Sequence, residues 1–120
     1  MDALEHLPLS PRDFLILLVL ADDPLHGYGI LKAVEERTGD EVPLDPANLY
    51  RSLKRLRRDG IVEEAEPPED GGDVPLEQRR YFSLTETGRA VVAAEAARLE
   101  RLTRVAREAR LLEEGRAVLE

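Results

Sequence analysis

The segment from Asp45 to Gly60 holds the side chains of this sequence that are best suited to binding phosphate and the edges of nucleic-acid bases. It carries five basic and two acidic residues, in a chain of 120 residues with a formal net charge of −8. A second basic island, Arg79 to Ala90, has three basic residues and one acidic residue, whereas Ile61 to Gln78 has seven acidic residues and no basic one. Arginine can bond guanine edges in bidentate fashion, and lysine can neutralise phosphate. Although the net charge argues against nucleic-acid binding, its distribution indicates a double-stranded DNA interface.

The first basic island has the pattern of a helix with its charges opposite an apolar seam. Asp45 suits the N-cap and Pro46 the first helical position, and Asp59-Gly60 suits the end. We therefore predict a helix from Asp45 to Asp59. Three leucines share one side of its helical wheel and would fix it on the domain: Leu49, Leu53 and Leu56.

We predict that the opposite face of this helix contacts DNA, with help from the start of the last strand. Small and polar residues near the helix N-terminus would let the backbone approach closely, and the N-terminus itself favours phosphate. The candidate DNA-binding residues are Ala47, Asn48, Tyr50, Arg51, Lys54, Arg55, Arg58, Arg79 and Arg80. Two alternatives stay open: the helix charges could be an ordinary solvated face, and Arg79 and Arg80 could simply offset the preceding acidic residues.

Two helices are predicted before the basic one. Ser10-Pro11 begins the first, and its stretch Phe14 to Leu20 is apolar on all sides, so this helix is expected to be central or shared with a partner chain. The second is predicted at about Tyr28 to Thr38, with Gly39 as its C-terminal cap.

Two short strands and a long helix are predicted after the basic helix. The strands cover Ile61 to Ala65 and Arg79 to Leu84, and the acidic, Pro- and Gly-rich tip Glu66 to Gln78 joins them. A phosphate backbone would repel this tip, so only the base of the hairpin is expected to touch DNA. The last helix starts at Thr85 and is predicted to run to about Glu113, roughly 40 Å by the standard rise.

The apolar stripe of the last helix is longer than so small a domain can cover, which predicts a partner chain. The order of elements is that of a mainly α (α+β) winged helix-turn-helix, with residues 1–84 as the DNA-binding domain and residues 85–120 as a C-terminal dimerisation helix. The predicted dimer interface comprises Phe14, Leu17, Leu18, Val92, Ala96, Leu99, Leu102, Ala106, Ala109 and Leu112.

Other classes of function find no support in the sequence. Cysteine is absent, and His6 and His26 lie far apart, without a metal-binding spacing or a nucleophile beside them. We therefore expect no metal, no cofactor and no enzymatic activity. The start lacks a signal peptide, and the longest apolar run, Phe14 to Ala21, is too short to cross a bilayer, so a cytoplasmic protein without membrane contact is expected.

Three blocks of the sequence resemble those of PadR-like transcriptional regulators. Leu25 to Ile30 (LHGYGI) is similar to the family's HGYxI signature, Leu49 to Val62 to its LYxxLxxLxxxGLV block, and Arg80 to Gly88 to its RxYxLTxxG junction. The resemblance implies that His26 is a structural residue at a helix start and that the tyrosine matching Tyr50 is associated with DNA-backbone contact. It also implies a dimer built from the first and last helices.

These observations together predict a sequence-specific transcriptional regulator, a repressor that binds a pseudo-palindromic operator as a homodimer through the third helix. A small-molecule effector at the dimer interface is a further partner that this arrangement allows. The alternative is a winged-helix module for protein–protein interaction that binds no DNA.

Overall fold

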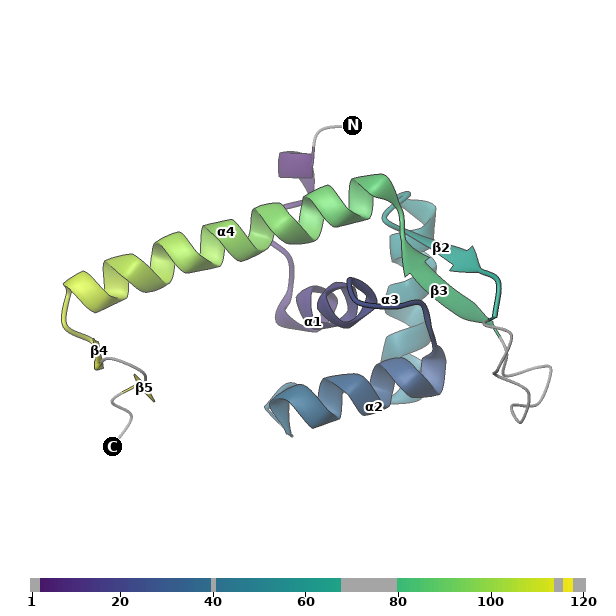
Figure 1. Cartoon of the computed structure of the whole chain (residues 1–120), viewed down its shortest axis with the longest axis horizontal. Coiled ribbons are helices and arrows are strands. Elements are labelled where there is room, and N and C mark those ends of the chain that lie inside the picture. Colours follow the sequence, from purple (N-terminus) through teal and green to yellow (C-terminus); the bar gives the residue numbers. More distant parts are fainter. Residues whose placement is uncertain (1–2, 40, 68–79, 114–115, 118–120) are drawn as a thin grey trace.

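Helices α1 (Pro11–Leu20), α2 (Gly27–Thr38) and α3 (Pro46–Arg58) pack together, and a small sheet and the long helix α4 (Glu86–Glu108) follow them in the chain (Figure 1). This computed structural model describes residues 3–39, 41–67, 80–113 and 116–117. Helix α1 contacts both α2 and α4, as its apolar sequence predicted for a central helix, and the short 3-10 helix η1 (Ala3–His6) lies against α4.

Side-chain caps fix where the helices begin. Three of them accept a hydrogen bond from the backbone N–H three residues later: Ser10 from Asp13 (3.1 Å), Asp45 from Asn48 (2.8 Å) and Thr85 from Gly88 (2.9 Å). Each satisfies one of the N–H groups that a helix leaves unpaired, which confirms the predicted starts of α1, α3 and α4. Helix α2 is capped by His26, whose Nδ1 accepts from the Gly29 N–H (2.9 Å), so this histidine has a structural role.

The core joins the inner faces of all four helices to the sheet. The leucine seam of α3 is fully buried, as predicted, and each such leucine contributes on the order of 2 kcal/mol through its removal from water. The residues of this core cluster are Ile16, Leu17, Val19, Leu20, Ile30, Val34, Leu49, Leu53, Leu56, Ile61, Val62, Phe82, Leu84, Val91 and Val92.

In the described part of the chain, β1 (Leu25–His26), β3 (Tyr81–Leu84) and β2 (Val62–Ala65) form one antiparallel sheet in that order. Strands β2 and β3 confirm the two predicted strands, which begin slightly later than predicted, and we call this pair the wing. The sequence did not predict β1, because a two-residue strand is too short to show an alternating pattern. It pairs with β3 through Leu25 opposite Phe82.

The start of α4 is locked onto the end of α3. The Thr85 hydroxyl donates to the Gly60 carbonyl oxygen (2.6 Å), and the Thr85 N–H donates to that of Ile61 (3.1 Å). Gly88 lies so close to this turn that a Cβ on it would come within 2.1 Å of the Ile61 oxygen. A residue without a side chain is therefore required here, which is the physical reason for the glycine of the junction motif.

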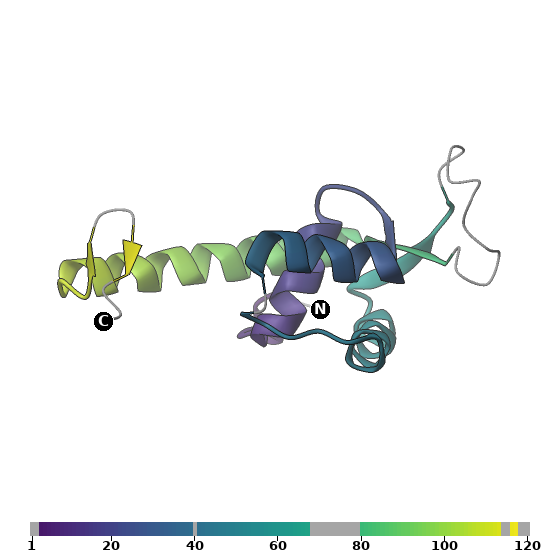
Figure 2. The ribbon, with the colours of Figure 1, turned by 90° about the horizontal axis from the view of Figure 1, so that it is seen from below.

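Helix α4 extends well beyond the other helices (Figures 1 and 2). It ends at Glu108 rather than near Glu113, because Arg110 adopts a left-handed backbone conformation (φ 63°) that stops the helix. Strands β4 (Leu112–Glu113) and β5 (Arg116–Ala117) then pair as a separate ribbon. None of the helices in the described part of the chain has the length and apolarity needed to cross a membrane.

Candidate DNA-binding surface

Helix α3 has two chemically different faces. One buries Leu49, Leu53 and Leu56 together with the small hydroxyl of Ser52. The other carries the residues predicted to contact DNA, all of them exposed except the half-buried Asn48: Ala47, Asn48, Tyr50, Arg51, Lys54, Arg55 and Arg58. The domain therefore holds this helix by its seam and presents its polar side outward.

Arg51 and Lys54 are the cations of this face that are open to an external anion. Within the described residues, neither forms an ion pair with a carboxylate. Arg51 Nη1 donates to the side-chain oxygen of Asn48 (3.1 Å), whose amide nitrogen donates in turn to Asp45 (3.1 Å). This short series starts at the helix cap and holds Arg51 along the first turns of α3.

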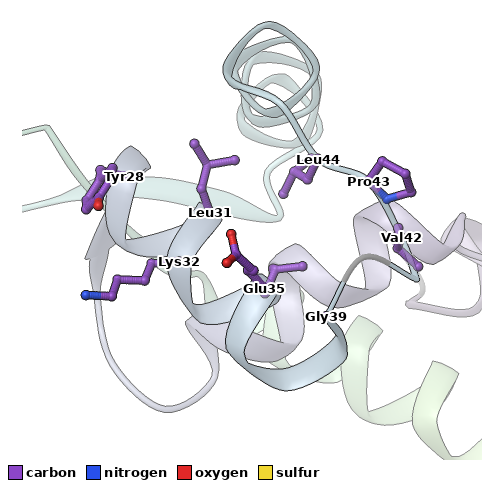
Figure 3. Close-up of a pocket in the computed structure, with 9 residues that line it drawn as sticks. Tyr28, Leu31, Lys32, Glu35, Gly39, Val42, Pro43 and Leu44 are labelled. Atoms are coloured by element: carbon purple, nitrogen blue, oxygen red, sulfur yellow. The ribbon is translucent and has the colours of Figure 1, made fainter.

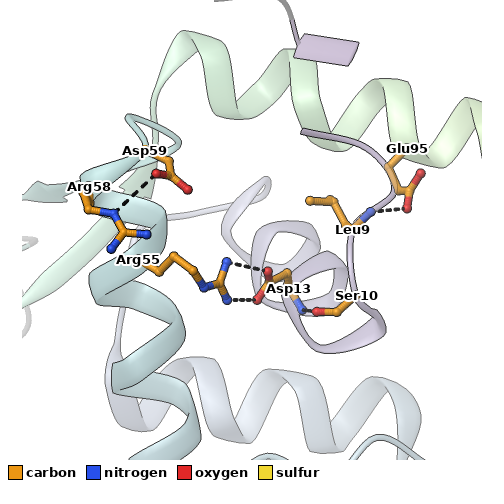
Figure 4. Close-up of polar contacts among 7 residues, drawn as sticks. All are labelled: Leu9, Ser10, Asp13, Arg55, Arg58, Asp59 and Glu95. Atoms are coloured by element: carbon orange, nitrogen blue, oxygen red, sulfur yellow. Dashed lines mark hydrogen bonds and ion pairs between the residues drawn. The ribbon is translucent and has the colours of Figure 1, made fainter. Parts of the chain in front are cut away.

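Arg55 is engaged inside the protein. Its guanidinium donates two parallel hydrogen bonds to the carboxylate of Asp13 in α1, at 2.9 and 3.0 Å (Figure 4). The hydrogen bond to Asp13 raises the pKa of Arg55, and the carboxylate's charge acts in the same direction. Arg58, further along, makes a looser contact with Asp59 at 3.6 Å.

The base of the wing adds cations that are already paired. Arg80 donates through Nε to Glu64 (2.6 Å) and lies over the ring of Phe82, 5.6 Å from its centre. Glu64 is also 3.8 Å from Nη1 of Arg57. The hydrogen bond from Arg80, and secondarily the charges of Arg80 and Arg57, hold the pKa of Glu64 below its ordinary value. Arg79, predicted to act beside Arg80, lies outside the described residues.

A groove of about 340 Å³ runs between α3 and the wing. It is lined by Tyr50, Leu53, Lys54, Arg57, Arg80 and Phe82. Arg57 was not among the predicted DNA-binding residues, although its position in the same basic run of the sequence could have indicated it. A helical wheel cannot show that the wing lies beside it.

Tyr50 is seated against the start of α2. A Cβ on Gly27 would come within 2.2 Å of the Tyr50 hydroxyl oxygen, so the glycine makes room for this ring. Tyr50 is nevertheless exposed at one side. Packing against Gly27 therefore fixes the position of Tyr50 beside the α3 cations.

The residues predicted for the dimer interface differ in burial. Leu17 (0% exposed) and Val92 (7% exposed) belong to the core of the chain itself, so they offer little or no surface to a partner. Ala109 and Leu112 lie beyond the end of α4 and so leave the helical stripe. The others remain accessible: Phe14, Leu18, Leu99 and Ala106 are half-buried, and Ala96 and Leu102 are exposed. Val105, which was not predicted, is 60% exposed beside Leu102 at 52%.

Two further hollows lie away from α3's basic face. One, of about 360 Å³, lies between α2 and the chain leading to α3, and Lys32 and Glu35 are among the residues that line it (Figure 3). The other, of about 400 Å³, lies between α1 and α4 and is lined by Phe14, Leu15 and Leu99, among others. The described residues contain no cluster of three or more His, Asp or Glu side chains that could hold a metal ion.

Three packed helices with a basic third helix, a wing behind it and a long final helix define a winged helix-turn-helix protein. The model of the PadR-like family of transcriptional regulators matches residues 16–94. The chain belongs to this family, as the three sequence blocks indicated.

Known proteins agree with this assignment at the level of the fold. The crystal structure of a PadR family transcription regulator from Clostridium difficile R20291 has 24% sequence identity and a TM-score of 0.67, covering 82% of this chain and 97% of that one. Bacillus subtilis PadR in complex with operator DNA has 22% identity and a TM-score of 0.58, covering 72% of this chain and 47% of that one.

A relative by sequence comes from a much longer protein. An uncharacterized 37.1 kDa protein in transposon TN4556 of Streptomyces fradiae is 37% identical over 94 residues, which is 78% of this chain and 24% of the relative. The chain therefore spans about a quarter of that relative's length.

Proposed function

We propose that this PadR-like regulator is a sequence-specific, repressor-type DNA-binding protein that places α3 in the major groove of its operator. The observation that carries the proposal is the pairing state of α3: Arg51 and Lys54 are exposed and form no ion pair among the described residues, while the leucine seam holds the helix on the core. A helix held in this way fits the major groove.

The side chains divide into base-reading and backbone-binding roles. Arg51, held along the helix by Asn48, suits a bidentate bond to guanine, and Lys54 suits neutralisation of a phosphate. Ala47 permits close approach of the backbone at the start of α3. Tyr50, Arg58 and the groove cations Arg57 and Arg80 flank this centre and suit the two phosphate strands.

The test is the double variant Arg51→Ala/Lys54→Ala on duplex DNA from upstream of the gene. We expect about a 100-fold or greater loss of affinity, and a shallower dependence of log affinity on log salt, because a base contact and a phosphate contact disappear. The matched control is Arg104→Ala/Arg107→Ala, which removes the same charge from exposed positions of α4. Wild-type affinity and salt slope in the α3 variant would refute the proposal.

A homodimer is proposed from the outer half of α4. The buried residues of this helix, such as Val91 and Glu95, lie in its first half, and Leu102 and Val105 are exposed further along. Covering this stripe with a second copy would present two α3 helices to successive major grooves about 34 Å apart, which suits a pseudo-palindromic operator. Sedimentation velocity of Leu102→Glu/Val105→Glu should show a monomer. Arg101→Gln/Arg104→Gln, which lowers the net charge by the same two units, serves as the control. A dimer that persists in Leu102→Glu/Val105→Glu would exclude this interface.

The cleft between α1 and α4 supports a small-molecule effector at the dimer interface. Its walls are largely apolar, and Glu95 and Arg98 supply polar groups at one side. An apolar dye such as anilinonaphthalene sulfonate should bind there. Its fluorescence should fall in Phe14→Ser, and unchanged fluorescence would place the dye elsewhere.

The exposed carboxylates of the wing favour a second candidate, a protein-interaction module. Glu63 and Glu66 are exposed beside Glu64, in a chain of net charge −8. The same DNA-binding assay separates the two, since a module of this kind would show no affinity for the upstream duplex above that for unrelated DNA.

A further inference from the structure

The Asp13–Arg55 pair joins α1 to α3 at a site shielded from water on one side. The Asp13 side chain is only 8% exposed, whereas that of Arg55 is 43% exposed. A nearly buried carboxylate that lost its cation would keep the cost of its desolvation without the compensating attraction, so the pair strongly favours one arrangement of the two helices. The two hydrogen bonds are parallel, and this geometry fixes direction as well as distance.

Asp13 is itself held firmly in place (Figure 4). Its backbone N–H donates to the Ser10 cap (3.1 Å), and the N–H of the preceding Leu9 donates to Glu95 of α4 (2.8 Å). Glu95 is 1% exposed and also accepts from Arg98 (3.0 Å). The start of α1 is therefore anchored to α4, and Asp13 provides Arg55 with a fixed acceptor.

The position of Arg55 on α3 relates this anchor to the candidate DNA contacts. Arg51 lies one turn before Arg55 on the same side of the helix, and Lys54 is its neighbour in sequence. A leucine seam holds a helix against a core but specifies its rotation less sharply than a two-point hydrogen bond does. A rotation of α3 that broke the pair would also turn Arg51 and Lys54 away from their present directions.

We propose that Arg55 is a positioning residue, not a DNA contact: Asp13 holds its guanidinium, and the pair sets the rotation of α3 on α1 and so the direction in which Arg51 and Lys54 meet the operator. This inference rests on the proposed function, and it revises the role that the sequence predicted for Arg55.

Asp13→Asn gives opposite results under the two roles. If Arg55 positions α3, loss of the carboxylate's charge weakens specific binding by about tenfold and leaves the salt slope unchanged, since no phosphate contact is lost. If Arg55 binds phosphate, the same change frees its guanidinium, so binding tightens and the slope becomes steeper by about one unit per contact. Tighter binding would overturn the proposal.

Arg55→Lys keeps the positive charge but cannot reproduce the two-point bond. The positioning role predicts roughly tenfold weaker operator binding with nonspecific affinity retained, whereas a phosphate contact predicts affinity close to that of the wild type. A double-mutant cycle extends the comparison: Arg55→Gln should weaken wild-type binding about tenfold, but should have little further effect in the Asp13→Asn background. An equal loss in both backgrounds would overturn the proposal.

Two controls distinguish a failure of the positioning role from misfolding of a variant and from a failure of the proposed function. Circular dichroism and the active fraction from stoichiometric titration show whether each variant is folded. If Asp13→Asn does not fold, Arg55→Lys provides the test of the positioning role. If wild-type protein binds its upstream DNA no better than unrelated DNA, the proposed function fails. If wild type binds specifically and Arg51→Ala/Lys54→Ala does not, while Asp13→Asn binds more tightly, the positioning role alone fails.

Discussion

Helix α3 and the wing border the same groove, but the exposed cations Arg51 and Lys54 of α3 differ from Arg80 of the wing in their ion pairing. In α3, Arg51 and Lys54 form no ion pair within the described residues. At the wing, Arg80 donates to Glu64 at 2.6 Å. The register explains this difference: Glu64 lies opposite Phe82 in the ladder, and Arg80, two residues before Phe82, projects from the same face of the sheet.

The formal charge of a segment therefore overstates the charge that the segment can offer to a ligand. A cation that already holds a carboxylate must exchange that contact for a phosphate, so its net gain on binding is small, whereas an unpaired cation gains the whole contact. We therefore expect affinity to be concentrated in α3 and the wing to modulate it.

Charge reversal in each region should produce the largest contrast. Lys54→Glu places a negative charge on the groove-facing helix, and we expect affinity for the operator to fall by about 100-fold or more. Arg80→Glu removes a cation that Glu64 already occupies, and we expect a loss of roughly tenfold or less. Fluorescence anisotropy on one labelled duplex measures both, with Arg104→Glu on α4 as the control. Equal losses of affinity at the two positions would show that pairing with Glu64 does not reduce the contribution of Arg80 to DNA binding.

Removing the charge of Glu64 should let the wing cations contribute to DNA binding as the unpaired cations of α3 do. Glu64→Gln releases Arg80, and also Arg57 at 3.8 Å, for contact with phosphate. We expect affinity to rise by roughly two- to tenfold and the salt dependence to become steeper. The exposed neighbour Glu63 supplies the matched control, because it forms no ion pair among the described residues. If Glu63→Gln raised affinity equally and with the same slope, general repulsion rather than pairing would be the cause.

Much of the fold could be predicted from local signals. The cap residues and prolines located the starts of α1 and α3, because these effects act within one turn of a helix. The end of α4 was predicted too late, since nothing in its regular pattern shows that Arg110 takes a left-handed conformation. Strand β1 exists through its pairing with β3, a contact between residues far apart in the chain.

The candidate site could be predicted as a face but not as a set of partners. Helical spacing correctly separated the leucine seam of α3 from its cations. It could not show that Arg55 meets Asp13, 42 residues earlier, or that Glu64 reaches Arg80 from the neighbouring strand. These pairings depend on how the elements pack, and they decide which of the predicted cations remain open to DNA.

The Arg80–Glu64 ion pair of the wing should be nearly insensitive to pH in the neutral range. The hydrogen bond from Arg80 lowers the pKa of Glu64, so this carboxylate stays ionised and paired above the ordinary glutamic acid pKa of about 4.3. The pairing is lost only as the pH falls further, through the lower pKa of the folded state. The ratio of operator affinities between Glu64→Gln and wild type should therefore stay constant from about pH 8 to pH 5.5. Every other ionisable group is common to the two proteins, so its effect cancels in this ratio. A ratio that declined towards one near pH 6 would mean that Glu64 takes up a proton there, and the wing cations would then be as open to DNA as those of α3.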